Sequence, residues 1–437
     1  MLGALGDIRA LSLGALGVLG ATGATAEPAP VKSWQIIGEY NDTGFAAQSS
    51  NASSLQVVTR KRDIPNIDLE AIASLEQSFF IGGSSGGLDT SIGNSVNIRH
   101  RMMAGLALLA MSASPVVVPA NEGAYPVLEY FGDIPAGTTI YLDKEATVPT
   151  AGLNTGPQTI IYSTQGASSA VGRKAGATVT FDASGLSSGT GTLMCPITIG
   201  YGVHLYPTFC GVGDSIISSN GDPILGDGGP VGVEGRLGQG GAWFRRSRYL
   251  AQALAGRTVP LRLLSRPSAE MQAMRANGGV GAAKRRESYR YCNTLVITMG
   301  ANDLGNGRTA AQLKADIEAE IVVYRAMWAA ANPLLPCYVI VCTITPRGST
   351  AYNVPVGFAA QIVEHNYNVR HGLIVGSNGY LDPNIAVSDP ADETIWASAS
   401  YCGASDFLHP VAAGYALIAM ETSPYLARNS SPWRAFL

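Results

Sequence analysis

The sequence predicts an α/β fold in two parts, a β-rich first half followed by a second half built on a parallel sheet. From about residue 31 to 209 the chain is rich in Gly, Ser, Thr and Val, and turn residues separate its short apolar runs. That spacing is typical of a β-sandwich, here expected to be jelly-roll-like. After about residue 210, apolar runs alternate with helical patterns of roughly 10–20 residues, which indicates a parallel sheet with helices on both faces. We therefore expect a β-rich domain at 31–207 and a three-layer α/β/α domain at 208–437.

The first 26 residues have the features of an export signal. Arg9 precedes the apolar stretch Leu11–Leu19, and Ala24-Thr25-Ala26 supplies a small-x-small cleavage pattern. Asp7 and several glycines depart from that pattern, so a flexible Gly/Ala-rich leader is the alternative. A signal implies a secreted, cell-surface or periplasmic protein. No run approaches 18 apolar residues, so we expect no membrane span.

In the β-rich half, turn residues separate the expected strands. These strands are Trp34–Ile37, Leu55–Thr59, Pro115–Pro119, Thr138–Leu142, Thr159–Tyr162 and Ala177–Phe181. Two segments are less regular. Asp68–Ser78 is expected as a short helix, and Met102–Met111 as either a helix or a buried strand.

In the second half, strands and helices alternate. Expected strands are Pro207–Gly213, Val259–Leu264, Thr294–Met299 and Cys337–Ile344. Expected helices are Ala242–Ala255, Ala269–Ala276, Ala310–Ala331 with Thr309 as its N-cap, Phe358–Val369 and Val411–Glu421.

The charge and cysteine patterns exclude some classes of function. The net charge is −3 and no long basic run occurs, so a nucleic-acid partner is not expected. The six cysteines show no zinc-type spacing, and we expect no metal and no cofactor. An even number is compatible with disulfides in an exported protein. Buried free thiols explain Cys292, Cys337 and Cys342 equally well.

Three short motifs lie where a strand is expected to end or a helix to begin. They are Gly213-Asp214-Ser215, Gly300-Ala301-Asn302-Asp303, and Asp406-Phe407-Leu408-His409-Pro410. In a parallel sheet the carboxyl ends of the strands meet at one edge, where ligands bind. The sequence therefore predicts that the three motifs form one site.

Each motif supplies one part of a nucleophilic site. Ser215 follows a glycine that permits a tight turn, and its hydroxyl needs a base to become a good nucleophile. His409 is the candidate base, and Asp406, three residues earlier, is the candidate carboxylate that orients the imidazole. Taken singly, Ser215 also suits a loop or N-cap, and Asp406 also suits a helix cap beside a surface histidine.

Asn302 is the candidate donor to an oxyanion, because its side-chain amide follows a strand end. As a turn residue it has an ordinary structural explanation as well. Gly300 leaves room for a substrate, and Gly300 and Asp214 are our candidates for substrate binding. Asp303 is expected to bond backbone amides of its own loop and to take no part in the chemistry.

Together the three motifs resemble blocks I, III and V of the SGNH (GDSL) hydrolase family, over residues 208–425. The resemblance implies a flavodoxin-like fold and a metal-free esterase mechanism. Ser215 would be the nucleophile and Asp406 and His409 the rest of the triad. The backbone N–H of Ser215 and the side chain of Asn302 would form the oxyanion hole.

One block departs from the family pattern. The family has a block II glycine on the loop after the second strand, and its backbone N–H completes the oxyanion hole. This chain has Leu264-Ser265-Arg266-Pro267-Ser268-Ala269 at that place, with no glycine. Gly278, Gly279 or the backbone N–H of Ser268 could substitute, and we leave that position unassigned.

The first half resembles, more loosely, β-rich domains that precede this hydrolase module in some secreted bacterial proteins. Phe80-Ile81-Gly82-Gly83 and the segment 114–120 carry that likeness. The sequence thus predicts an esterase that acts through an acyl-enzyme on a small-molecule or glycan ester, such as an acylated carbohydrate or a short-chain ester. The alternative is an inactive surface or phage-tail binding protein with a hydrolase-like half.

Overall fold

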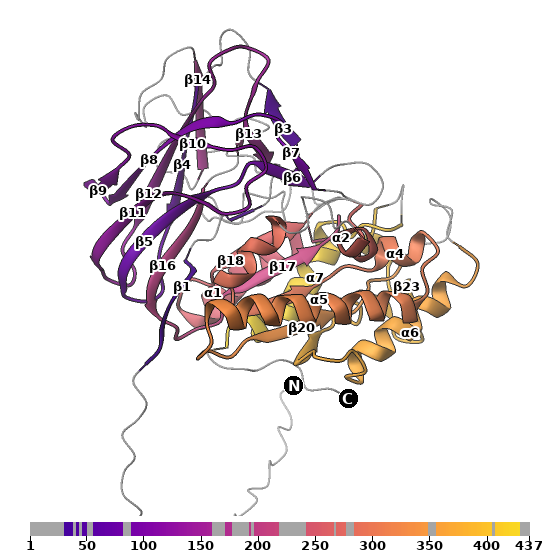
Figure 1. Cartoon of the computed structure of the whole chain (residues 1–437). Helices are drawn as coiled ribbons and strands as arrows, with labels where there is room; N and C mark the ends of the chain where they lie inside the picture. Colours follow the sequence, from indigo (N-terminus) through magenta and orange to yellow (C-terminus); the bar gives the residue numbers. More distant parts are fainter. Residues whose placement is uncertain are drawn as a thin grey trace, which may run out of the picture. The chain divides into compact units, whose positions relative to one another are not determined.

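The computed structural model describes a set of segments within residues 30–428 (Figure 1). The described residues are 30–37, 41–42, 46–49, 56–81, 89–159, 171–176, 192–193, 196–217, 242–265, 268–276, 284–347, 355–403 and 407–428. Several parts of the predictions lie outside them. They are the leader 1–26, residue 55, Gly82 and Gly83, residues 160–162 of one expected strand, the strand Ala177–Phe181, Cys195, Arg266, Pro267, Gly278, Gly279 and Asp406.

A six-stranded sheet, all of its pairs parallel, forms the centre of the second half, in the order β2-β18-β17-β19-β20-β21. Its strands are β2 (Asn41–Asp42), β17 (Phe209–Gly213), β18 (Leu261–Ser265), β19 (Thr294–Ile297), β20 (Tyr338–Cys342) and β21 (Gly379–Leu381). Numbered along the chain from β17, the last five follow the order 2-1-3-4-5 of flavodoxin-like sheets. The predicted parallel sheet is confirmed. Its edge strand β2 comes from the first half and was not predicted.

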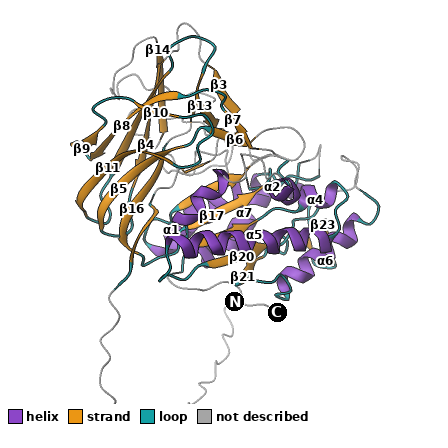
Figure 2. Cartoon of the chain, viewed as in Figure 1, coloured by secondary structure: helices purple, strands orange, loops and turns teal. Residues whose placement is uncertain are grey.

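Helices follow the strands, as predicted. They are α1 (Ala242–Ala255), α2 (Met271–Ala276), α4 (Ala301–Gly305), α5 (Ala310–Ala331), α6 (Phe358–Arg370) and α7 (Ala412–Leu426). Helix α1 packs against α7, while α2, α4 and α6 pack against α5, so the helices form two groups around the sheet (Figure 2). Thr309 caps α5 through a full capping box with Gln312, as the sequence predicts. Helix α7 runs five residues past the predicted end and includes Pro424.

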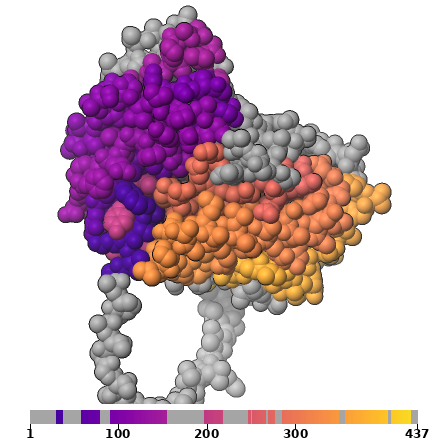
Figure 3. All heavy atoms as spheres, viewed as in Figure 1, coloured from indigo at the N-terminus to yellow at the C-terminus, as the bar shows by residue number. Residues whose placement is uncertain are grey.

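Burial explains why the strands of this sheet are continuous apolar runs. All four residues of β19 and all five of β17 are buried. In the space-filling view, the orange and yellow residues of the second half form a continuous visible surface (Figure 3). A strand covered on both faces buries every side chain. Apolar side chains suit such a strand, because their transfer out of water is favourable.

Apart from β2, the strands in the described part of the first half form antiparallel sheets. One has the order β1-β16-β5-β11 and another the order β10-β8-β12-β4-β14, with β9 paired to β8. Their strands are β1 (Lys32–Ile36), β4 (Gln56–Asp63), β5 (Leu69–Glu76), β8 (Val96–Ala104), β9 (Ala107–Met111), β10 (Val116–Val118), β11 (Tyr125–Ile134), β12 (Ile140–Thr147), β14 (Val171–Gly176) and β16 (Ile197–Val203). The smaller sheets contain β3 (Ala46–Ser49), β13 (Asn154–Thr159) and β15 (Thr192–Leu193), and β6 (Phe79–Ile81) with β7 (Asp89–Ser91).

Two predictions for this half need revision. The helix expected at Asp68–Ser78 is wrong, because those residues form β5, which pairs with β11 on one side and β16 on the other. Of the two readings of Met102–Met111, the strand is correct but its expected burial is wrong. The segment is split between β8 and β9, which form a hairpin around Gly105, and every residue of β9 is exposed or half-buried. A jelly-roll-like connectivity of these sheets stays a prediction.

A buried set of charges lies between the strands of this half. The Glu76 carboxylate accepts from Lys144 Nζ at 2.6 Å and pairs with His100 Nε2 at 2.8 Å. The Ser74 hydroxyl bonds His100 Nδ1 at 2.6 Å, and all four side chains are at most 3% exposed. Burial acts to raise the pKa of Glu76, but Lys144 and His100 bring that pKa below its ordinary value.

Within Val31–Leu437, which form one compact unit, the core of the parallel sheet continues into the first half. Ile36, Leu75 and Ile197 belong to the same hydrophobic cluster as the strands of the parallel sheet. The division at residues 207 and 208 stays a prediction.

Candidate active site

The site lies where the carboxyl ends of β17 and β19 meet the segment before α7. Ser215 follows β17 after one residue, and Asn302 lies in the first turn of α4, after β19. His409 is three residues before α7. Neighbouring parallel strands β17 and β19 bring the first two motifs to one edge of the sheet, as the sequence predicts.

Ser215 and His409 form a direct hydrogen bond. Ser215 Oγ lies 2.8 Å from His409 Nε2, and each residue is only 5% exposed. A heavy-atom distance in this range is what proton transfer between a hydroxyl and a base requires. For the hydroxyl to donate, the imidazole must carry its own proton on Nδ1. The arrangement suits a serine whose proton is taken by histidine.

Glycine is required before the serine because the chain is crowded there. A Cβ at Gly213 would overlap the side chains of Ile217 and Thr298. The Thr298 hydroxyl donates to the carbonyl of Val212 at 3.1 Å, so this side chain has little freedom to move away. Close packing therefore explains the glycine at position 213, at the end of the strand that Ser215 follows.

The segment that carries His409 is held by several contacts. Gly403 N donates to the His409 carbonyl at 2.9 Å, and Cys402 pairs with Pro410 in an isolated bridge. Phe407 adopts a φ of 48°, which is uncommon for a residue with a side chain. The Trp396 indole donates to the Phe407 carbonyl at 3.0 Å, so it holds this turn in place.

Asp406 lies outside the described residues, so its role as the orienting carboxylate stays a prediction. Trp396 is a residue that the sequence analysis missed. A single tryptophan carries no sequence signal for such a contact, because most tryptophans are explained by core packing.

The Asn302 side chain is held by a hydrogen bond of its own amide. Its Nδ2 donates to the carbonyl of Ala269 at 3.1 Å, and the side chain is half-buried. An amide nitrogen has two hydrogens, so this bond fixes the group and leaves one N–H for a further acceptor. Gly300 has a φ of 142°, and a Cβ there would crowd Leu313 and Ile344. The backbone conformation and the packing explain why residue 300 is a glycine. A role for Gly300 in substrate binding stays a prediction.

The unassigned block II position has a candidate in Ser268. Ser268 adopts a φ of 64°, in the left-handed region that favours glycine. It directly precedes Ala269, whose carbonyl accepts from Asn302. A serine thus takes a glycine-like backbone conformation beside the amide of Asn302.

Asp303 has a structural role, broadly as expected. Its carboxylate accepts from the backbone N–H of Met271 at 3.0 Å and of Gln272 at 2.9 Å. It therefore bonds the start of α2 and not its own loop. Burial raises the pKa of this carboxyl to about 6, although these two hydrogen bonds act to lower it.

Asp214 is buried directly beside the serine. It is 1% exposed, and its Oδ1 accepts from Ile216 N at 2.9 Å. Burial raises the pKa of this carboxyl to about 7, and the nearby Asp303 also raises it. Its Oδ2 has no hydrogen-bond partner within the described residues. A substrate-binding role for Asp214 stays a prediction.

Five cysteines in the described part of the chain are free thiols, namely Cys210, Cys292, Cys337, Cys342 and Cys402. Of the two explanations left open for Cys292, Cys337 and Cys342, free thiols are correct. Among the same described residues, no group of three His, Cys, Asp or Glu side chains could hold a metal ion. Nor is any described helix both long and apolar enough to cross a bilayer.

Residues 212–417 match the model of the GDSL-like lipase/acylhydrolase family. The matched region contains Ser215, Asn302 and His409. The match confirms the resemblance to GDSL hydrolases, over slightly less than half of the chain.

Solved structures with detectable similarity are distant. The lipase Lip_vut3 from a goat rumen metagenome is 11% identical, with 49% of this chain and 95% of that one covered and a TM-score of 0.35. An active-site mutant of a family two carbohydrate esterase from Clostridium thermocellum is 10% identical, with coverages of 90% and 97% and a TM-score of 0.34. A lipase/acylhydrolase from Enterococcus faecalis is 17% identical, with coverages of 52% and 100% and a TM-score of 0.34. No curated protein matches the chain.

Proposed function

We propose that this protein is a serine carboxylic-ester hydrolase that works through an acyl-enzyme intermediate. The observation that carries the proposal is the 2.8 Å hydrogen bond between Ser215 Oγ and His409 Nε2. The match of residues 212–417 to an acylhydrolase family supports it. The substrate is a small-molecule or glycan ester, with acylated carbohydrates and short-chain esters as the classes to test first.

In the acylation step, Ser215 Oγ attacks the ester carbonyl carbon while His409 Nε2 takes the hydroxyl proton. The carbonyl oxygen becomes an oxyanion, which accepts hydrogen bonds from the free N–H of Asn302 and the backbone N–H of Ser215. We assign the third donor to the backbone N–H of Ser268. The tetrahedral intermediate then expels the alcohol, which receives its proton from His409.

In the deacylation step, water attacks the acyl-enzyme carbonyl and His409 takes the proton of that water. The second intermediate then breaks its bond to Ser215 Oγ and releases the carboxylic acid, while His409 returns the proton to that oxygen. Asp406 would bond His409 Nδ1–H, which fixes the tautomer and stabilises the imidazolium. No step needs a metal or an organic cofactor.

The direct test is hydrolysis of p-nitrophenyl acetate by the purified chain and by its Ser215→Ala variant. We expect the variant to lose at least about 10³-fold in kcat/KM, because the nucleophile and base act as one unit. Ser95→Ala is the matched control, since Ser95 is exposed in the β-rich half. Equal rates for the wild type and Ser215→Ala would remove Ser215 from the reaction. An inert folded wild type would favour the binding-protein alternative.

A further inference from the structure

A cavity of about 500 Å³ lies among the second-half residues, within the range of about 300–1,000 Å³ that small-molecule sites occupy. Its main lining residues are Arg347, Phe358, Ile362, Trp396, Cys402 and Phe407. Helix α6 contributes Phe358 and Ile362, and strand β23 (Asp392–Trp396) contributes Trp396. None of these residues has a role in the chemistry proposed above.

The cavity borders the segment of the catalytic base. Phe407 lies two residues before His409, and its carbonyl accepts from the indole of Trp396 at 3.0 Å. Cys402, also in the lining, pairs with Pro410 directly after the histidine. One wall of the cavity is therefore made of residues that hold His409.

A second contact connects the cavity lining to the segment that carries the oxyanion donor Asn302. Arg347 Nη1 donates to the carbonyl of Ala301 at 3.0 Å, and Ala301 directly precedes Asn302. The guanidinium also lies 5.1 Å from the ring centroid of Phe358. The lining thus connects to the proton acceptor through Phe407 and to the oxyanion donor through Arg347. These two contacts place the cavity beside the segments that carry both groups.

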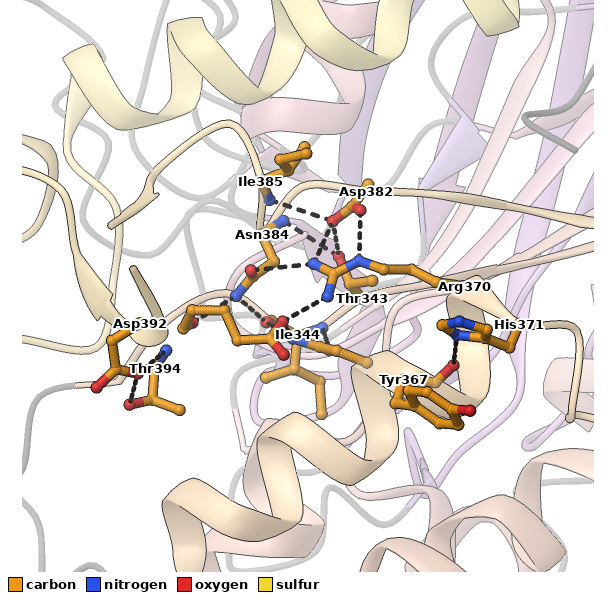
Figure 4. Close-up of polar contacts among 12 residues, drawn as sticks. Thr343, Ile344, Tyr367, Arg370, His371, Asp382, Asn384, Ile385, Asp392 and Thr394 are labelled. Carbon is orange, nitrogen blue, oxygen red and sulfur yellow. Dashed lines mark hydrogen bonds and ion pairs between the residues drawn. The ribbon is translucent and has the colours of Figure 1, made fainter. Parts of the chain in front are cut away.

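A network of buried polar groups fixes the β23 wall. Arg370 donates to Asp382 at 2.7 Å and to Glu393 at 2.6 Å, and Asn384 Nδ2 donates to the Glu393 carbonyl at 2.9 Å. Figure 4 shows Arg370 directed at Asp382 and Asn384 beside Thr343. Strand β23 is thereby attached to α6 and to the ends of β20 and β21. A wall held in this way is formed before any ligand arrives, which lowers the cost of binding.

The chemistry of the lining favours an aromatic ring over a sugar. Three of the lining side chains are aromatic, namely Phe358, Trp396 and Phe407. Aromatic rings pack on one another with a preference beyond their buried area. The polar side chains Asp392 and Thr394 bond each other, with Thr394 Oγ1 2.6 Å from Asp392 Oδ1. The third polar side chain is the Arg347 guanidinium, which donates to the Ala301 carbonyl, so the lining offers the hydroxyls of a sugar ring fewer polar side chains than apolar ones.

We propose that this cavity binds an aromatic ring of the substrate ester, carried on either its acyl or its alcohol part. The proposal rests on the proposed esterase function and narrows its substrate class to aryl-bearing esters. Ring binding holds the ester with its carbonyl between Ser215 and Asn302, so ring esters gain in kcat/KM over small esters.

The first experiment measures acid release from four esters in a pH-stat. They are ethyl acetate, ethyl 3-phenylpropanoate, 2-phenylethyl acetate and ethyl octanoate. At least one of the two ring esters is expected to exceed ethyl acetate in kcat/KM by about tenfold or more. Which of the two is preferred tells whether the acyl or the alcohol part enters the cavity.

A matched pair of variants on α6 tests the cavity itself. Ala359 lines it and Ala360 does not, while both are exposed. Ala359→Trp places a large side chain in the cavity, so the ratio of kcat/KM for the ring esters to kcat/KM for ethyl acetate should fall about tenfold. Ala360→Trp should keep the wild-type preference. An unchanged preference in Ala359→Trp would overturn the assignment, as would an ethyl octanoate rate equal to that of the better ring ester.

A binding measurement separates this proposal from the esterase proposal. With the Ser215→Ala variant, calorimetry should detect the binding of 3-phenylpropanamide or of N-(2-phenylethyl)acetamide. The affinity should be at least about tenfold higher than that for octanamide, and Ala359→Trp should remove it. If no ester is hydrolysed but the aryl amide binds in this way, the esterase proposal fails and the cavity assignment stands. No aryl binding in the folded protein overturns the cavity assignment.

Discussion

The hydroxyl of Ser215 and the imidazole of His409 come from positions 194 residues apart, yet they lie 2.8 Å from each other. The sequence predicts this pair because each residue sits at a strand end or a helix start, where a parallel sheet gathers its polar groups. Residue type and position were sufficient here. They were not sufficient for Ser268, because a backbone φ of 64° leaves no mark in the sequence when a serine adopts it.

Ser268 gives the first prediction at the residue scale. Ser268→Gly should keep kcat/KM for p-nitrophenyl acetate within about threefold, because glycine adopts a positive φ without strain. Ser268→Val should lower kcat/KM at least about tenfold, because a β-branched side chain disfavours that conformation and displaces the N–H. Steady-state kinetics and melting temperatures would be measured together. A folded Val variant with wild-type kinetics would argue against an oxyanion role for this amide.

Asp214 gives a prediction about pH and stability. Its folded pKa of about 7 lies above the ordinary value of 3.8, so the folded state holds the proton more tightly than the unfolded state. The stability from this group is therefore complete below about pH 4 and is lost as the pH rises to about 7. Asp214→Asn cannot ionise. Its melting temperature relative to wild type should rise by several degrees between pH 5 and pH 8.

Thermal unfolding of both proteins across that range checks the Asp214 prediction. Any constant cost of the new amide cancels in the comparison, because it is the same at each pH. A difference in melting temperature that does not change with pH would mean that Asp214 is ionised throughout.

At the scale of elements, alternating strands and helices made the second half predictable, whereas β5 was not. Its sequence, Leu69 to Glu76, contains good helix formers, and local preference alone gives a helix. Pairing with β11 and β16 overrides that preference, and all its residues except Glu70 are buried. Strand β2 was missed for a related reason, since an Asn-Asp pair is typical of a turn.

The turn before α7 gives a prediction at this scale. Trp396→Phe keeps a ring in place but removes the indole N–H that bonds the Phe407 carbonyl. We expect kcat for ethyl acetate to fall about ten- to a hundredfold with little change in KM. A small displacement of His409 moves the base away from Ser215 but leaves the substrate contacts unchanged. Tyr367→Phe, on the exposed side of α6, is the control and should be unchanged. A variant with wild-type kcat, or one in which only KM rises, would show that Trp396 does not position the base.

At the scale of the whole molecule, hydrophobic residues of the first half share a core with the parallel sheet. The first half also contains a fully buried set of charges, which composition alone does not reveal. Glu76, His100 and Lys144 lie on three different strands, β5, β8 and β12. Their partnership depends on strand pairings between residues distant in sequence, so no local pattern predicts it.

Removing the carboxylate of this set should destabilise the protein strongly. Glu76→Gln removes the carboxylate that accepts from the buried Lys144 ammonium, and breaking a buried ion pair in this way costs about 3–5 kcal/mol. Glu129→Gln, on the neighbouring strand β11, changes an exposed carboxylate and should stay within about 0.5 kcal/mol of wild type. Urea denaturation measures both. Similar free energies of unfolding for the two variants would show that the buried charges contribute little net stability.

Covalent labelling with a fluorophosphonate probe tests the esterase function most directly, because it reports on the nucleophile without any choice of substrate. We expect one label per folded chain, located by peptide mass analysis on Ser215, no label on Ser215→Ala, and labelling slowed at least about 10³-fold in His409→Ala. A folded wild-type chain that stays unlabelled, or that carries its label on another residue, would contradict the assignment of Ser215 and His409 as a nucleophile and its base.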